Sequence, residues 1–291
     1  MALTVLVNPG AGDEQSSALA EALKSAGLGA SVEEVEGKDI AKRTAELARR
    51  GDPTVAVAGG DGSISAAAGA LAGTDTALGI LPLGTLNHLA RDLKIPFDLE
   101  AAAEILANGK RRKIDVAELN GRHFVNNSAI GIYPLMVVDR ESQQHRLGRS
   151  KRLAMLVASF RTLVRFHHER LRLLVNESES ELIDTPLLFV GNNDYRLAFP
   201  AAGKRDRLDD GRLCVLVMRK KGVPGLLAAT FRALVGLTRP DDMIQIEDVT
   251  RLRVSSSRHE IEVSLDGETQ CFEPPLDYKI RPLALTVIAP A

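Results

Sequence analysis

One pattern constrains the fold of this chain more than any other: apolar runs, each followed by a glycine-bearing turn and a helical pattern. The clearest case is the apolar run at residues 54–58, because Gly59-Gly60-Asp61-Gly62-Ser63 follows it directly. Strands that alternate with helices form a parallel sheet that is covered by helices on both faces. Residues 1–110 are therefore predicted to form a Rossmann-like α/β domain.

The expected strands of this domain cover residues 3–7, 30–35, 54–58 and 77–81, and the expected helices cover residues 18–26, 40–50, 65–71 and 86–93. From about residue 112 the pattern changes to strand-like runs that are joined by turns. Residues 113–119 and 123–130 flank Asn120 and Gly121, a dipeptide that is the strongest short hairpin signal. Further strand-like runs occur at residues 171–175, 186–190, 213–218, 249–255 and 260–265. We therefore predict an α/β domain at residues 1–120 and a β-rich domain at residues 121–279, with a last strand within residues 280–291 that can return to the first domain.

Composition and charge argue against several classes of protein, among them nucleic-acid-binding, secreted and membrane-spanning proteins. The formal net charge is −1, so no overall basic field indicates a nucleic-acid partner. Cys214 and Cys271 lack the spacing of a metal site or a CxxC motif, and two reduced thiols are expected. The N-terminal residues lack the basic region and long apolar stretch of a secretory signal, and no apolar run approaches the roughly 18 residues of a membrane span. A cytoplasmic protein is expected.

Three glycine-bearing loops follow predicted strands: residues 8–12 (Asn-Pro-Gly-Ala-Gly), 59–63 and 82–87 (Pro-Leu-Gly-Thr-Leu-Asn). The carboxyl ends of parallel strands share one edge of the sheet, where open α/β sheets bind ligands. Glycine amides can face phosphate oxygens, and an acid such as Asp61 then favours a Mg²⁺ ion between them. By itself the first loop could equally be a tight turn and the third a helix cap, whereas three glycines within four residues argue against a simple turn for residues 59–63. A dinucleotide fingerprint would need a glycine where Gln15 stands.

Together with residues 90–96 (Ala-Arg-Asp-Leu-Lys-Ile-Pro), 126–131 (Asn-Asn-Ser-Ala-Ile-Gly), 208–211 (Leu-Asp-Asp-Gly) and 266–268 (Asp-Gly-Glu), these loops resemble the successive motifs of the diacylglycerol kinase catalytic family. That family includes sphingosine and ceramide kinases and bacterial soluble lipid kinases. The resemblance runs essentially from end to end.

The resemblance implies an ATP-dependent lipid kinase, with a nucleotide-binding α/β domain, a C-terminal β-sandwich and an active site in the cleft between them. Glu268 would be the general base on the lipid hydroxyl, and Asp61 and Asp115 would support a catalytic Mg²⁺ through water. A second, structural Mg²⁺ would involve Asp210 and backbone oxygens near Arg207 and Arg212. The implied ATP contacts are Asn8, Pro9, Gly10, Gly12, Gly59, Gly60, Asp61, Gly62, Ser63, Thr85 and Asn87.

Two departures from the family pattern affect the phosphate site. Asp13 and Glu14 follow the first loop, where they could weaken nucleotide binding or cap the following helix. Ser63 stands where many members have threonine, and it keeps the hydroxyl.

A lipid substrate would require peripheral contact with the inner membrane face. Residues 140–172 hold nine Lys or Arg and two acids, with apolar residues at helical spacing. This segment could be a basic amphipathic helix on anionic lipid, but a core helix is the preferred explanation of its apolar stripe, and the role of its basic face stays open. Residues 223–237 are a second apolar stretch, which could line a lipid entrance or simply pack in the core. The adjacent residues His167 and His168 would point in different directions on a helix, so we do not expect them to bind a metal together.

Two alternatives stay open: a NAD kinase-like enzyme, which shares the Gly-Gly-Asp-Gly loop, and a nucleotide-binding regulatory protein without turnover. Retention of Asp61, Asp115 and Glu268 favours an enzyme. The acceptor lipid and the oligomeric state are not fixed by the sequence, and a homodimer stays open.

Overall fold

The computed structural model describes residues 3–8, 13–131, 169–178, 180–196, 203–219, 225, 232 and 242–291. The chain divides into two compact units. Unit 1 comprises Met1–Asn126, Arg207–Gly211 and Arg281–Ala291, and unit 2 comprises Asn127–Asp206 and Arg212–Ile280. The first boundary falls after Asn126 rather than at residue 120, because residues 122–124 pair with the preceding strand.

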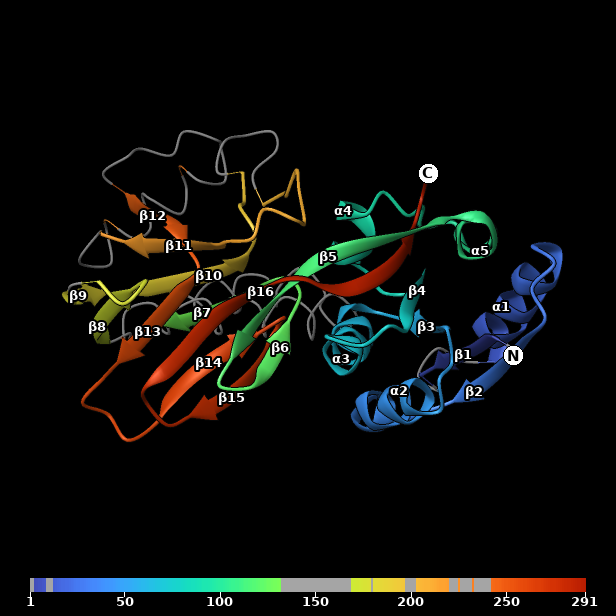
Figure 1. Ribbon diagram of the computed structural model, residues 1–291, viewed down its shortest axis with the longest axis horizontal. Coiled ribbons are helices and arrows are strands. Elements are labelled where there is room, and N and C mark those ends of the chain that lie inside the picture. The colour runs from blue at the N-terminus through green and yellow to red at the C-terminus, as the bar shows by residue number, and fades with distance from the viewer. Residues whose placement is uncertain are drawn as a thin grey trace, which may run out of the picture. The chain divides into compact units, whose positions relative to one another are not determined.

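Unit 1 alternates strands and helices through its first half (Figure 1). Its strands are β1 (Leu3–Val7), β2 (Ala30–Glu34), β3 (Thr54–Gly59), β4 (Ala77–Pro82), β5 (Lys110–Leu119), β6 (Arg122–Phe124) and residues 281–289 of β16 (Leu276–Ala289). Its helices are α1 (Asp13–Ser25), the 3₁₀ turn η2 (Gly37–Asp39), α2 (Ile40–Arg49), α3 (Asp61–Leu71), α4 (His88–Asp92) and α5 (Leu99–Asn108).

A parallel sheet with the strand order β2-β1-β3-β4-β16 forms the centre of unit 1. The chain runs from β1 to β2 in one direction and from β2 to β3 in the other, so right-handed crossovers place α1 and α2 on opposite faces. Helix α1 packs with α5, and α2 packs with α3 (Figure 1). Because both faces are covered, β3 is buried along residues 55–59 and reads as a continuous apolar run. The predicted α/β fold is confirmed.

Two helices begin where glycine and asparagine set the backbone. Helix α3 begins at Asp61, four residues before the predicted start, with Gly60 as an extended N-cap (φ −87°, ψ −176°). The glycine-rich residues 59–63 are therefore a strand end and the first turn of a helix rather than a separate loop. Helix α4 begins only after Asn87, because Asn87 adopts a left-handed backbone (φ 47°) that a helix cannot include.

Apart from isolated helical residues at positions 225 and 232, the regular structure of unit 2 among its described residues is β. Its strands are β7 (Asn127–Gly131), β8 (Glu169–Val175), β9 (Ser180–Thr185), β10 (Leu187–Asn192), β11 (Leu213–Met218), β12 (Met243–Val249), β13 (Arg251–Ser255), β14 (Ile261–Leu265), β15 (Glu268–Phe272) and residues 276–280 of β16. They form the antiparallel sheet β12-β11-β10-β7-β14-β15 and the antiparallel part, β16-β13-β8-β9, of the ten-stranded sheet to which the strands of unit 1 also belong through β16. A hydrogen bond of 3.0 Å between the buried hydroxyls of Ser128 and Tyr278 joins the two sheets. The predicted β-rich second domain is confirmed.

The hairpin expected at Asn120 and Gly121 is present, and both residues have positive φ (45° and 84°), as a type I′ turn requires. The strand after it is shorter than predicted. β6 ends at Phe124, and β7 begins at Asn127 as a strand of unit 2.

Candidate functional site

The carboxyl ends of β1 and β3 lie side by side where the strand order of unit 1 reverses. In open α/β sheets this reversal point opens the crevice in which ligands bind. Asn8 follows β1, and its side-chain Nδ2 lies so close to Gly37 that a Cβ there would be 3.3 Å away. The predicted ATP contacts Pro9, Gly10 and Gly12 lie outside the described residues.

The N-terminus of α3 is the part of this edge best suited to an anion. The helical hydrogen-bond ladder begins with Ile64, whose amide donates to Gly60 (3.1 Å), so the amides of residues 61–63 precede it. Such amides, with the helix dipole behind them, favour phosphate oxygens. Gly59 has to be a glycine, because a Cβ there would lie 2.8 Å from the Cβ of Ser63.

The loop after β4 packs directly onto this helix terminus. A Cβ on Gly84 would lie 2.6 Å from the Cα of Gly60 and 2.7 Å from Oδ1 of Asn87. The Asn87 side chain is buried and shapes the loop: Oδ1 accepts from Gly84 N (3.0 Å) and Nδ2 donates to Gly84 O (2.7 Å). Thr85, by contrast, is exposed. Among these predicted contacts, the structure thus gives Asn87 a role in loop shape and leaves Thr85 accessible.

Asp61 links the two turns. It occupies the first turn of α3, and its Oδ1 accepts a hydrogen bond from the backbone amide of His88 (2.7 Å), the first residue of α4. The residue is only partly buried. Mg²⁺ is usually bound through one or two carboxylates together with waters and substrate phosphates, and a partly exposed carboxylate beside free helix amides fits that requirement. The amide of His88 is a contact that the motifs did not indicate.

Asp115 lies on β5 and is fully buried, with 0% exposure. Its Oδ2 accepts from the amide of Gly211 (2.7 Å) and its Oδ1 from the amide of Leu283 (2.8 Å). The structure thus brings Asp115 and the 208–211 motif together, because the Asp115 carboxylate accepts a backbone amide of that motif. This surrounding fits a metal-supporting role poorly, because a carboxylate without exposed surface is not accessible to a metal-bound water.

The residues of the predicted second Mg²⁺ site are held in ion pairs. In unit 1, Nε of Arg207 lies 3.1 Å from Asp209 and 3.2 Å from Asp210, and the hydrogen bond to Asp209 raises the pKa of Arg207. In unit 2, Arg212 pairs with Asp194 (3.0 Å) and Asp248 (2.9 Å). The ion pair with Arg207 partly neutralises Asp210, and these contacts leave the backbone oxygens near Arg207 and Arg212 untested, so the second Mg²⁺ site stays a prediction. Within the described ranges, no group of three or more His, Cys, Asp or Glu is arranged for a metal.

Glu268 belongs to unit 2, where it is the exposed first residue of β15. The preceding Asp266 and Gly267 have positive φ (48° and 91°) and form a two-residue turn, across which Leu265 pairs with Glu268. Asp266 fixes this turn to β7, since its Oδ1 accepts from Asn127 N (3.0 Å) and its own amide donates to Asn127 O (2.8 Å). The predicted base therefore stands on a hairpin whose turn is hydrogen-bonded to β7.

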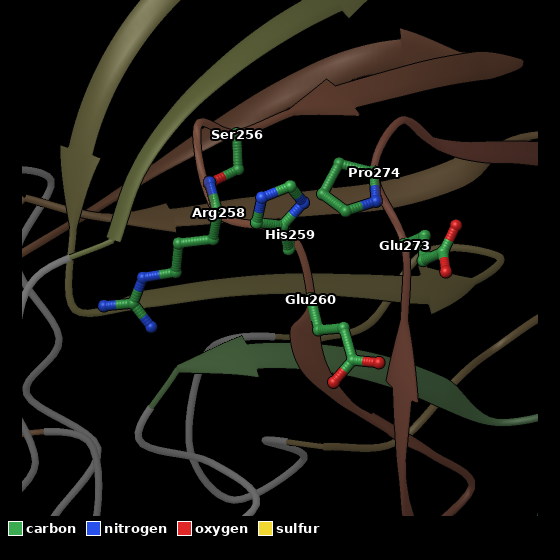
Figure 2. A pocket seen from close by; sticks show the side chains of 6 residues that line it. All are labelled: Ser256, Arg258, His259, Glu260, Glu273 and Pro274. Atoms are coloured by element: carbon green, nitrogen blue, oxygen red, sulfur yellow. The ribbon is translucent and has the colours of Figure 1, made fainter.

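A polar pocket of about 420 Å³ lies elsewhere in unit 2, lined by Ser256, Arg258, His259, Glu260, Glu273 and Pro274. Figure 2 shows that Arg258 and Glu273 extend to opposite sides of it. Arg258 pairs with Glu169 on β8 (2.9 Å). None of the predicted site residues lines this pocket, and its mixed, exposed charges define no ligand.

Three predictions concern residues that lie mostly or wholly outside the described part of the chain. Most of the basic segment 140–172, the pair His167 and His168, and most of the apolar stretch 223–237 lie outside the described residues. In the part of the chain that is described, no helix has the length and apolar character needed to cross a bilayer.

The fold and this edge of the sheet define a class: an α/β unit with glycine turns at the carboxyl ends of its strands, joined to an antiparallel β unit. The family profile described as "Diacylglycerol kinase catalytic domain" matches residues 2–119, less than half of the chain, and the match assigns these residues to that domain family. The resemblance seen in the motifs is confirmed.

Individual proteins agree with this assignment. A diacylglycerol kinase of Bacillus subtilis is 28% identical over 236 residues, which cover 79% of this chain and 76% of that protein. A Cronobacter sakazakii protein named "Probable lipid kinase YegS-like" is 41% identical over 100 residues, and this match spans only a third of the length of each protein (33%). The crystal structure of a diacylglycerol kinase from Bacillus anthracis shares the fold, with a TM-score of 0.71, 20% identity and coverage of 99% of this chain and 96% of that one.

Proposed function

We propose that this chain is an ATP-dependent lipid kinase that transfers the γ-phosphoryl of ATP to the hydroxyl of a diacylglycerol-like lipid. The observation that carries the proposal is the family domain at residues 2–119, whose α3 N-terminus lies at the reversal point of the parallel sheet. Phosphoryl transfer depends mainly on positioning and charge stabilisation, and the backbone amides of such a helix end supply both for a phosphate.

On the nucleotide side, the amides of Asp61, Gly62 and Ser63 would bind the phosphates, with Asn8 and Thr85 at the neighbouring loops. Gly60 and Gly84 let the two loops approach closely, and Asn87 keeps the second loop in shape. Mg²⁺, when bound, would neutralise charge on the phosphates, and Asp61 would hold it through water. No step is assigned to a second Mg²⁺.

On the acceptor side, Glu268 would accept the proton of the lipid hydroxyl as it attacks the γ-phosphorus, while ADP leaves. An exposed carboxylate on a hairpin whose turn is hydrogen-bonded to β7 suits a general base that has to meet a hydroxyl from the membrane. The reaction requires unit 1 and unit 2 to act on the same substrates, and we propose that the nucleotide and the lipid meet between them. A lipid acceptor also implies peripheral contact with the inner membrane face.

The test is transfer of ³²P from γ-labelled Mg²⁺-ATP. Diacylglycerol, monoacylglycerol, sphingosine and ceramide are presented in mixed micelles, with NAD⁺ in a parallel tube. Label in an organic-extractable lipid is expected and identifies the acceptor. Label on NAD⁺ alone would replace the proposal with a NAD kinase-like enzyme, and no label with ATP still bound would favour a regulatory protein.

The role of Glu268 is tested by Glu268→Gln, with Glu262→Gln as the matched control. Both glutamates are exposed and lie on the paired strands β14 and β15. Loss of a general base lowers kcat by roughly 10²–10⁴-fold, and ATP affinity should stay within about twofold. Glu262→Gln should behave as wild type. Near-normal turnover of Glu268→Gln would remove this residue from the mechanism.

A further inference from the structure

Asp115 connects three segments of unit 1 that are distant in the sequence. Its carboxylate accepts amides from Gly211 and Leu283, and its own backbone amide donates to the carbonyl of Leu208 (2.7 Å). All of these residues belong to unit 1. A buried carboxylate that accepts a hydrogen bond on each oxygen fixes both partners strongly, because hydrogen bonds to a charged group are stronger than those between neutral groups.

These partners lie where the chain passes between the units. The segment Arg207–Gly211 visits unit 1 for five residues, with unit 2 residues on both sides of it. Leu208 anchors it, being 2% exposed within the core of unit 1. Leu283 lies three residues after Ile280, at which the chain leaves unit 2 for the last time. Asp115 is therefore hydrogen-bonded to two separate crossings, meaning the two segments near which the chain passes from one unit to the other.

The backbone at Leu283 indicates that the tie is needed. Gly211 has φ 69°, and Leu283 has φ 51° although it is a bulky residue that rarely adopts this conformation. The Leu283 side chain is 49% exposed, so packing of that side chain gives little compensation for the strain. The hydrogen bond from its amide to Asp115 is the contact that favours this conformation.

We infer that Asp115 is a positioning residue, which fixes both chain crossings through backbone amides, and that it does not support Mg²⁺. The inference rests on the proposed function for its effect on catalysis, since the crossings link the unit with Asp61 to the unit with Glu268. The contacts themselves do not depend on that function. The inference departs from the metal-supporting role that the family resemblance implies for Asp115.

The experiment compares Asp115→Asn with Asp61→Asn by hydrogen exchange and by Mg²⁺ titration of activity. In Asp115→Asn, exchange of the amides of Gly211 and Leu283 should accelerate by roughly tenfold or more, the factor that corresponds to one lost charge-assisted hydrogen bond. Its kcat should fall while the Mg²⁺ concentration for half-maximal activity stays within about twofold. Asp61→Asn should show the reverse: a raised Mg²⁺ requirement and unchanged exchange at both amides.

A raised Mg²⁺ requirement in Asp115→Asn without faster exchange would overturn the inference, and so would faster exchange with normal kcat. If that variant fails to fold, the wild-type protein still decides. Its Gly211 and Leu283 amides should be protected equally in EDTA and in Mg²⁺-ATP, and loss of protection on adding Mg²⁺-ATP would show that Asp115 turns to the metal. Absence of lipid phosphorylation by wild type would end the proposed function and leave the exchange result standing.

Discussion

The two cysteines differ sharply in their surroundings. Cys214 lies on β11 with 0% exposure, and burial raises the pKa of its thiol to about 11. Cys271 lies on β15 and is exposed, and both are free thiols. The thiolate is the form of cysteine that attacks thiol reagents, so a buried thiol that stays protonated is inert at ordinary pH.

We therefore expect a thiol reagent such as DTNB to modify one cysteine of the native protein at pH 8 and both in urea. Cys271→Ser should abolish the native reaction, and Cys214→Ser should leave its rate unchanged. Rapid modification of Cys214 in the folded protein would show that β11 opens far more readily than its burial indicates.

Among the secondary-structure elements, the turn after β4 and the terminus of α3 form the tightest backbone contact of the candidate site. Gly84→Ala would place a methyl 2.6 Å from the Cα of Gly60, which cannot move without shifting α3. Forced overpacking of this kind costs typically about 1–3 kcal/mol. We expect a loss of stability of this size in urea unfolding, together with weaker ATP binding.

Gly29→Ala is the matched control. Gly29 follows α1, has no positive φ, and no atom lies within 4 Å of its added Cβ. Its stability should change little or rise by up to about 1 kcal/mol, with normal ATP binding. Equal effects of the two substitutions would mean that the contact between Gly84 and Gly60 is not what fixes the site.

Local signals allowed most strands and turns of the fold to be predicted. The pair Asn120 and Gly121 specifies its hairpin through backbone preference alone, and the apolar run of β3 specifies a buried parallel strand. Helix α5 was not predicted although its N-cap is a readable signal: Asp98 Oδ1 accepts from Ala101 N at 2.9 Å.

Other features depend on contacts that no local pattern contains. The segment 207–211 belongs to unit 1 because Leu208 reaches its core and Asp115 binds Gly211, a partner 96 residues away. The residues themselves were visible as an Asp-Asp-Gly turn. Their place in the fold is set by a carboxylate on a distant strand, which sequence spacing cannot indicate.

At the scale of the whole molecule, the dependence of stability on pH should come partly from two carboxylates of unit 1. A side-chain hydrogen bond from Arg43 lowers the pKa of Glu33 below its ordinary 4.5, and one from Arg50 lowers the pKa of Asp52 below 3.8. Between the native and the unfolded pKa, the unfolded chain binds more protons, so stability falls as pH falls. The contribution is fully present above the ordinary values and is lost as pH drops through the lowered ones.

We therefore expect the double variant Glu33→Gln, Asp52→Asn to be less stable than wild type at pH 7 and to lose less stability between pH 5 and pH 2. Urea unfolding followed across that range measures both effects. Glu177→Gln is the control, because its carboxylate pairs with Arg251 in unit 2 and is 75% exposed, so it should follow the wild-type curve. If the double variant kept the full acid dependence, the protons taken up on unfolding would have to bind elsewhere in the chain. The two arginine pairs would then be surface contacts that contribute nothing measurable to the stability of unit 1.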